Sequence, residues 1–192
     1  MTSAQKQPRE DARRNREAVI DASLELLAEQ PNATMGAIAE LSGLGRTTVY
    51  RHFASREELV RALFERVVEE AKEATSEVVS MEGHVEDALR ALGPAIIAIG
   101  RRFQFLDGLR SIGDEVINES TTDPEDPLRY FLQDAQDRGE IRRDLTVQWI
   151  LNAINALAMA TMTEVIAGRQ DAESAGALLG ETMVRSFVAR PA

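Results

Sequence analysis

The sequence predicts an all-α protein of about nine helices, with an N-terminal domain over residues 12–70 and a larger C-terminal domain over residues 71–192. Three observations lead to this fold class. Apolar residues recur every three or four positions, glycine and proline are sparse within the periodic segments, and no stretch alternates apolar and polar residues as a half-buried strand does. The chain has 192 residues, 44% of them hydrophobic, which is enough to bury a substantial core.

The first predicted helix covers residues 13–29 and ends before Pro31, which interrupts helices. Residues 1–12 are polar, and we expect them to be disordered. The start of the helix is basic, and two interpretations stay open: a solvated helix end, or an arm that reaches DNA. The basic residues are Arg13, Arg14 and Arg16, and the apolar stripe that follows is Val19, Ile20, Leu24 and Leu27.

Residues 34–53 have the pattern of a helix-turn-helix. Two short helical segments, 35–41 and 46–52, flank the turn Ser42-Gly43-Leu44. A turn of three or four residues that contains a glycine is the signature of this unit. Thr34 is the expected N-cap of the first helix, whose N-terminus is suited to meet a phosphate.

The second of these short helices is predicted to have an inward and an outward face. Val49 and Phe53 are expected to pack inward. The outward face is rich in hydrogen-bonding groups and contains no acid, a composition that suits the phosphate-lined grooves of DNA. Its members are Arg46, Thr47, Thr48, Tyr50 and His52. We therefore interpret residues 34–53 as a DNA-reading element.

A long helix is expected to follow this element. Ser55-Arg56-Glu57-Glu58 has the pattern of a capping box, in which the serine hydroxyl accepts from the glutamate N–H and the glutamate side chain reaches back. The helix is predicted to run to about residue 79, with Leu59, Leu63 and Phe64 facing inward. Its length suits it to join the two domains.

Charge is distributed unevenly along the chain. The net charge is -10, but residues 1–56 hold eight Lys/Arg against seven Asp/Glu, a net of +1. Residues 57–192 hold fourteen against twenty-five, a net of -11. An acidic C-terminal domain would repel DNA and orient the N-terminal domain towards it. The alternative is that the acidic surface only keeps the protein dispersed.

The C-terminal domain is predicted to contain further helices around a polar loop at 118–127. Gly93-Pro94 is expected to kink or divide the first of them. Residues 145–163 carry no charge and are long enough to span a bilayer, but three amides interrupt them, so we predict no membrane span and a helix buried on all sides. The predicted segments are 84–101, 102–117, 128–138, 145–163 and 172–189.

Several segments together resemble the DNA-binding domain of the tetracycline-repressor (TetR) family. They are Leu26-Leu27-Ala28-Glu29, Thr34 with Ile38-Ala39, Ser42 to Phe53, and Ser55-Arg56-Glu57-Glu58-Leu59. The resemblance covers about residues 12–70, and the block Thr-Val-Tyr-Arg-His-Phe is its most specific part. Pro31 and Thr47 stand where family members usually or commonly carry glycine, so no operator sequence is carried over.

The resemblance implies a role for each matching residue. Arg46 and Thr47 would face base edges, and an arginine can pair bidentately with guanine. Phosphates would be contacted by Thr48, Tyr50 and His52, and by Arg56 at the start of the next helix. Two alternatives stay open: Tyr50 is a half-buried core residue with its hydroxyl in solvent, and His52 is a capping or solvent residue.

The resemblance also implies a ligand cavity and a dimer interface in the C-terminal domain. The candidates for the cavity are Phe103, Phe105, Arg110, Tyr130, Trp149 and Met159, although aromatic residues at helical spacing are also typical of plain core. The last two predicted helices are rich in small residues and resemble the family's four-helix dimer interface, with Ala156, Ala160, Gly176 and Gly180 as candidates. Alternatively, these helices only close a monomeric core.

The function that this resemblance implies is a ligand-responsive transcriptional regulator, most often a repressor. It would bind a near-palindromic operator in double-stranded DNA as a homodimer and be released by a small-molecule effector. The alternative is a helical small-molecule-binding or interaction module without DNA-binding activity.

We predict no enzymatic activity, no catalytic residues and no cofactor. The sequence has no phosphate-binding glycine loop and no nucleophile motif. Its two histidines, His52 and His84, lie in different predicted domains, so we expect no metal site. The chain contains no cysteine and no recognisable signal peptide, which favours the cytoplasm.

Overall fold

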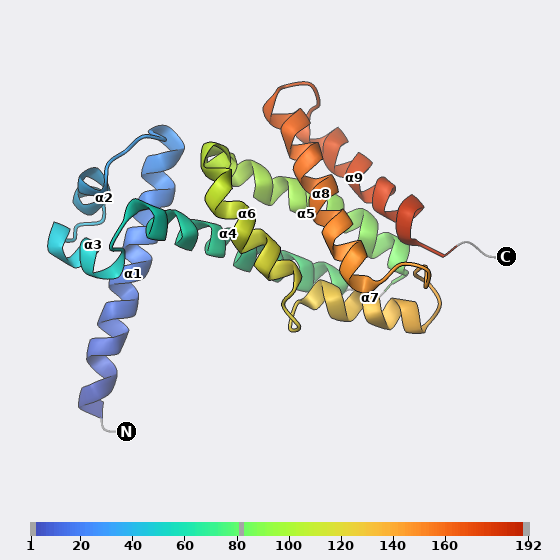
Figure 1. Cartoon of the computed structure of the whole chain (residues 1–192), viewed down its shortest axis with the longest axis horizontal. Coiled ribbons are helices and arrows are strands. Elements are labelled where there is room, and N and C mark those ends of the chain that lie inside the picture. The colour runs from blue at the N-terminus through green and yellow to red at the C-terminus, as the bar shows by residue number, and fades with distance from the viewer. Residues whose placement is uncertain (1–2, 81–82, 190–192) are drawn as a thin grey trace. The chain divides into compact units, whose positions relative to one another are not determined.

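The computed structural model describes residues 3–80 and 83–189, without the side chains of residues 3–9, 107, 110–112 and 118 (Figure 1). These residues form nine α-helices and one 3₁₀ helix, and they contain no β-strand, which confirms the all-α prediction. The helices are α1 (Ser3–Glu29), α2 (Met35–Leu41), α3 (Arg46–His52), α4 (Arg56–Val79), α5 (Val85–Arg102), η1 (Gln104–Leu109), α6 (Arg110–Thr121), α7 (Pro127–Asp137), α8 (Val147–Ile166) and α9 (Ala172–Phe187).

The chain divides into two compact units. The first holds the chain through Arg66 together with Phe105–Gly113, and the second holds Val67–Gln104 and the chain from Asp114 onward. The division therefore falls inside α4. The return of residues 105–113 to the first unit is not visible in the sequence pattern.

The core of the first unit is built from the apolar stripes of α1–α3 and the first turns of α4. The capping box of α4 forms as predicted, since the Glu58 N–H donates to Ser55 Oγ (3.2 Å) and the Glu58 carboxylate accepts from the Ala54 N–H (2.7 Å). The buried Ser23 hydroxyl is satisfied locally, since it donates to the Val19 carbonyl (2.6 Å). The buried side chains include Val19, Ile20, Leu27, Ile38, Val49, Phe53, Leu59 and Leu63.

Two predicted boundaries are wrong, and one predicted division of a helix is absent. Helix α1 begins at Ser3, so the predicted disorder before residue 13 is absent from Ser3 onward; this stretch is rich in good helix formers, which offset one proline. Helix α5 runs unbroken through Pro94. Helix α6 continues to Thr121, so the polar loop is shorter than the predicted 118–127, and Asp126 then caps α7 through the Leu128 N–H (2.8 Å).

In the second unit, α5 packs most extensively against α9, and α8 lies against both (Figure 1). Glycines make this contact possible, because the two backbones touch. A Cβ on Gly93 would lie 2.3 Å from the Gly176 carbonyl oxygen, and a Cβ on Gly180 would lie 2.5 Å from the Arg90 carbonyl oxygen. Pro94 has no N–H to donate to the Arg90 carbonyl. The Gly180 backbone approaches that same carbonyl, so no side chain larger than hydrogen fits there.

Helix α8 is buried on only one side, so the prediction that it is buried all round is wrong. Its buried residues are Val147, Ile150, Leu151 and Ile154. The opposite face is exposed and uncharged, and we refer to Trp149, Asn152, Ala156, Ala160 and Thr163 as the outward face of α8. By length and composition alone α8 would be able to cross a membrane, and one such helix is weak support for a membrane protein.

Candidate nucleic-acid interface

The helix-turn-helix is formed by α2, a tight turn and α3. Thr34 caps α2 as predicted, since its Oγ1 accepts from the Ala37 N–H (3.2 Å). Gly43 adopts φ +70°, a left-handed conformation that favours glycine, and the Leu44 N–H then donates to the Ala39 carbonyl (3.2 Å). Helix α3 begins after Gly45 and is held by the buried Val49.

The outward face of α3 is presented to solvent. Arg46 and Thr47 are exposed, and Tyr50 is 49% exposed, so all three side chains are accessible to a partner. The Arg46 guanidinium lies over Gly36 of α2, where an added Cβ would come within 2.9 Å of Nη2. Thr48 is half-buried, and α3 contains no acidic residue. The exposed side chains of α3 therefore offer hydrogen-bond donors, and α3 has no carboxylate that would repel phosphate.

Arg56 is held by the first unit itself. Its guanidinium donates to the carbonyl of Ala33 (2.5 Å) and to the carbonyl of Pro31 (2.9 Å), and so ties the loop before α2 to the first turn of α4. Both bonds are charge-assisted and are stronger than bonds between neutral groups. The family resemblance implies a phosphate contact for this side chain. The structure instead shows that it stabilises the frame that carries α2 and α3.

His52 lies at the end of α3 with one ring nitrogen buried. Its Nε2 is inaccessible to solvent and has no hydrogen-bond partner among the described residues. Burial lowers the pKa of His52 below its ordinary value of 6.5, and the nearby cations Arg51 and Arg16 lower it further. The neutral imidazole is therefore favoured, with Nδ1 as the nitrogen that remains for an outside partner.

The pKa of His52 predicts a pH dependence of stability. The folded state binds the His52 proton less tightly than the unfolded state does. The contribution of neutral His52 to the free energy of unfolding is therefore complete above pH 6.5, and it is lost as pH falls from 6.5 through the lowered pKa. Urea unfolding of the wild-type protein and of His52→Asn at pH values from about 8 to 5 checks this. The wild type should lose more stability on acidification, at one ionic strength for both proteins. Equal losses of unfolding free energy in the two proteins would contradict a lowered pKa of His52.

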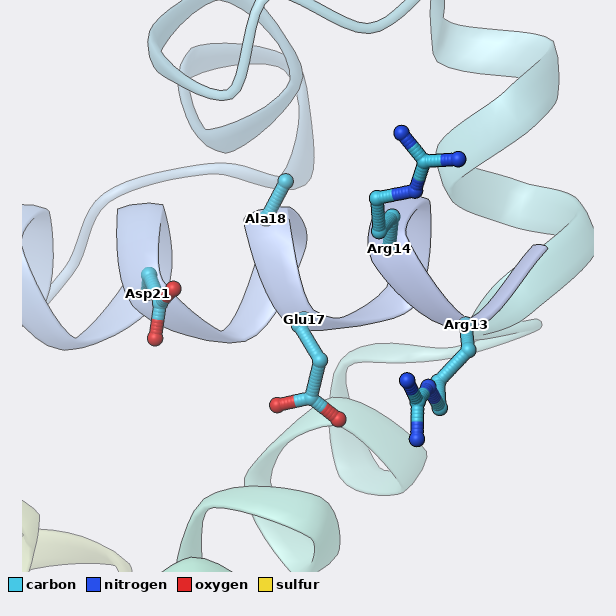
Figure 2. A pocket seen from close by; sticks show the side chains of 5 residues that line it. All are labelled: Arg13, Arg14, Glu17, Ala18 and Asp21. Carbon is cyan, nitrogen blue, oxygen red and sulfur yellow. The ribbon is translucent and has the colours of Figure 1, made fainter. Parts of the chain in front are cut away.

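The basic residues at the start of α1 have separate environments. Arg16 lies over the Phe53 ring, 5.2 Å from its centroid, and is 3.6 Å from the Glu65 carboxylate, so it is part of the packing of the first unit. Arg13 and Arg14 are exposed, and Figure 2 shows them projecting from different sides of α1. The hollow beside them is lined by five residues of α1 alone, which makes it a surface feature of one helix.

Three of the six residues predicted to line a cavity, Phe103, Tyr130 and Trp149, have different environments within the second unit. Phe103 is buried, whereas Tyr130 is 62% exposed and Trp149 is 53% exposed and forms a T-shaped pair with the Phe187 ring. Phe105 belongs to the first unit, and the side chain of Arg110 lies outside the described residues. Met159 lines a groove between α6 and α8 with a volume of about 680 Å³. The same groove contains the three amides that interrupt the apolar sequence of α8, which are Gln148, Asn152 and Asn155.

The four residues predicted to form a dimer interface have two environments. Ala156 and Ala160 are exposed on the outward face of α8. Gly176 and Gly180 are buried in α9 against the backbone of α5 in the same chain. Their small size is therefore used for packing within the subunit.

The fold and the acid-free face of α3 define a helix-turn-helix DNA-binding protein. The sequence profile described as "Bacterial regulatory proteins, tetR family" matches residues 19–63. The HTH-type transcriptional repressor LfrR of Mycolicibacterium smegmatis is 34% identical, with 59% of this chain and 69% of LfrR covered. The chain belongs to the tetR family of bacterial regulatory proteins, and it is a DNA-binding transcriptional regulator and not an enzyme.

Solved structures share the fold over nearly the whole chain. The fatty acid degradation regulator FadR from Bacillus halodurans has a TM-score of 0.71 at 16% identity, with 90% of this chain and 95% of that chain covered. LfrR from Mycobacterium smegmatis in complex with proflavine has a TM-score of 0.59 at 25% identity, with 93% of this chain and 99% of that chain covered. The likeness to FadR, at this identity, concerns the fold alone.

Proposed function

We propose that this protein is a ligand-responsive repressor that binds a near-palindromic operator as a homodimer and leaves it when a small molecule binds. The observation that carries the proposal is the outward face of α3, where Arg46, Thr47 and Tyr50 are exposed above a buried Val49 and no acid is present. Base contacts from Arg46 and Thr47 would give sequence preference, and phosphate contacts from Thr48, Tyr50 and His52 would fix the register.

The relatives support the response to a ligand. LfrR is a repressor, and its structure contains proflavine; the regulator SmeT, at 18% identity, is known as a complex with triclosan. We infer that the second unit of this chain binds a small molecule. Such a ligand shifts the population between two states only as far as it binds one of them better.

The outward face of α8 supports pairing. It is uncharged and includes Trp149, which is 53% exposed, next to the exposed Ala156 and Ala160. Exposed apolar surface of this kind marks interaction sites, and a two-fold pair would bring two copies of α3 to one operator. Cytoplasmic location accords with this role.

A salt titration tests the proposed function. We expect the protein to protect DNA upstream of its own gene, with log K falling linearly with log salt at a slope of about −0.9 for each phosphate contact. A scrambled duplex of equal length is the control. No binding, or an affinity insensitive to salt, would refute the proposal, and tight metabolite binding in that case would favour an interaction module that does not use DNA.

A further inference from the structure

A groove in the second unit has the composition of a binding site that the function described so far does not use. It lies between α6 and α8, has a volume of about 680 Å³, and so is of the size of small-molecule sites. Among the residues that the structure describes, its lining combines three amides, two hydroxyls, apolar side chains and one carboxylate, and contains no cation. The lining residues are Asp114, Ile117, Thr121, Thr122, Gln148, Asn152, Asn155, Ala156 and Met159.

The amides of this groove are oriented by a cation behind them. Arg129 Nη2 donates to Gln148 Oε1 (2.7 Å) and also to the Thr121 carbonyl (2.6 Å). With its oxygen fixed in this way, Gln148 must donate through Nε2, which it does to Asn152 Oδ1 (3.0 Å) and to the Thr121 carbonyl (3.1 Å). The direction of donation is therefore set by Arg129, and the Asn152 NH₂ is left as a donor.

Two further polar groups of the lining have capacity for a ligand. Asp114 is exposed and forms no ion pair within the described part of the chain, and the half-buried Asn155 amide has no hydrogen-bond partner there. Among the described residues of the lining, Asp114 is the only charged one, and its carboxylate would attract a positive charge, whereas the Arg129 guanidinium behind Gln148 is engaged by Gln148 and by the Thr121 and Asp123 carbonyls. Ile117, Ala156 and Met159 offer apolar contact.

We propose that this groove binds a cationic, partly apolar small molecule, with Asp114 facing the positive charge and the amides of α8 binding its polar edge. The proposal rests on the proposed ligand response and names its site and ligand class. Arg129 is a positioning residue, since it acts through Gln148.

The same network extends from the groove to α4. Arg129 Nε donates to the Asp123 carbonyl (3.0 Å), and the Asp123 carboxylate accepts from Lys72 Nζ (2.5 Å). This hydrogen bond raises the pKa of Lys72 and lowers the pKa of Asp123, so the pair is ionised at neutral pH. A ligand that moves Gln148 therefore acts on groups bonded to α4, the helix that continues into the first unit.

Calorimetric titration with two planar dyes tests the proposal. The probes are proflavine, a cation with two amino groups, and fluorescein, an anion of comparable size, both without DNA because planar cations intercalate. We expect the wild type to bind proflavine and not to bind fluorescein.

Asp114→Asn should weaken the binding of proflavine about tenfold or more, as expected for the loss of a charged hydrogen bond, and Asp114→Lys should abolish proflavine binding. Glu173→Gln and Glu173→Lys make the same charge changes on an exposed carboxylate outside the groove and should leave the affinity within about twofold.

Three results would overturn the proposal. They are a wild-type protein that does not bind proflavine, one that binds both dyes equally, and Asp114 variants that bind proflavine as tightly as their Glu173 counterparts. DNA binding, measured without dye, separates a failure of the groove proposal from a failure of the DNA-binding role. If the protein binds its operator normally but shows any of these three results, the groove is not the ligand site and the DNA-binding role stands.

Discussion

Replacing Arg46 by Ala is expected to weaken operator binding by about 1–3 kcal/mol for each copy of α3 on the DNA, and by about 2–6 kcal/mol for the proposed homodimer. The guanidinium is exposed and rests over Gly36, so its removal leaves the core of the first unit intact. Because we place Arg46 on a base edge, the variant should also discriminate less between the operator and its single-base variants. Fluorescence anisotropy with a panel of such duplexes measures both effects.

Tyr50→Phe is the matched comparison for Arg46→Ala. It removes only the hydroxyl of a side chain that is 49% exposed, and the ring keeps its packing. We expect it to weaken all duplexes of the panel by the same factor, because a phosphate contact carries no sequence information. If both variants change specificity equally, the division of α3 into a base-reading and a phosphate-contacting part is wrong.

Gly93→Ala should lower the free energy of unfolding by about 1–3 kcal/mol, even though alanine favours a helix by about 1 kcal/mol over glycine. The added methyl group would lie 2.3 Å from the Gly176 carbonyl oxygen and 2.5 Å from the Gly180 nitrogen. These are backbone atoms, which cannot rotate away, so α5 and α9 must separate. Urea unfolding followed by circular dichroism gives the free energy.

Gly100→Ala is the control on the same helix. A methyl group there would meet only the side chain of Met162, at 2.6 Å from its sulfur, and a methionine can change rotamer. We expect this variant to be neutral or slightly stabilising. Equal destabilisation by both substitutions would show that the helix and not the backbone contact determines the effect.

The first unit was largely predictable because its signals are local. The capping threonine Thr34, the glycine turn at Gly43 and the capping box at Ser55 each act within a few residues, and the structure contains all three. The role of Arg56 was not predictable, because its partners Pro31 and Ala33 are more than twenty residues away in sequence. An arginine at the start of a helix has the same local pattern whether it meets a phosphate or a carbonyl.

The second unit was predictable as helices but not as a site. Its aromatic residues were candidates by type alone, and Phe103 and Tyr130 have opposite environments because tertiary packing decides burial. The spacing of Gln148, Asn152 and Asn155 does indicate one polar face of α8. The sequence of α8 does not tell that α6 packs opposite this face, because that contact depends on tertiary structure.

The outward face of α8 and the groove share two residues, Asn152 and Ala156. If a second copy binds the face and an effector binds the groove, the two equilibria are thermodynamically linked. Each event then changes the other's equilibrium constant by the same factor. The effector affinity would vary with protein concentration, so dilution of the protein would itself change how much effector is needed to release DNA.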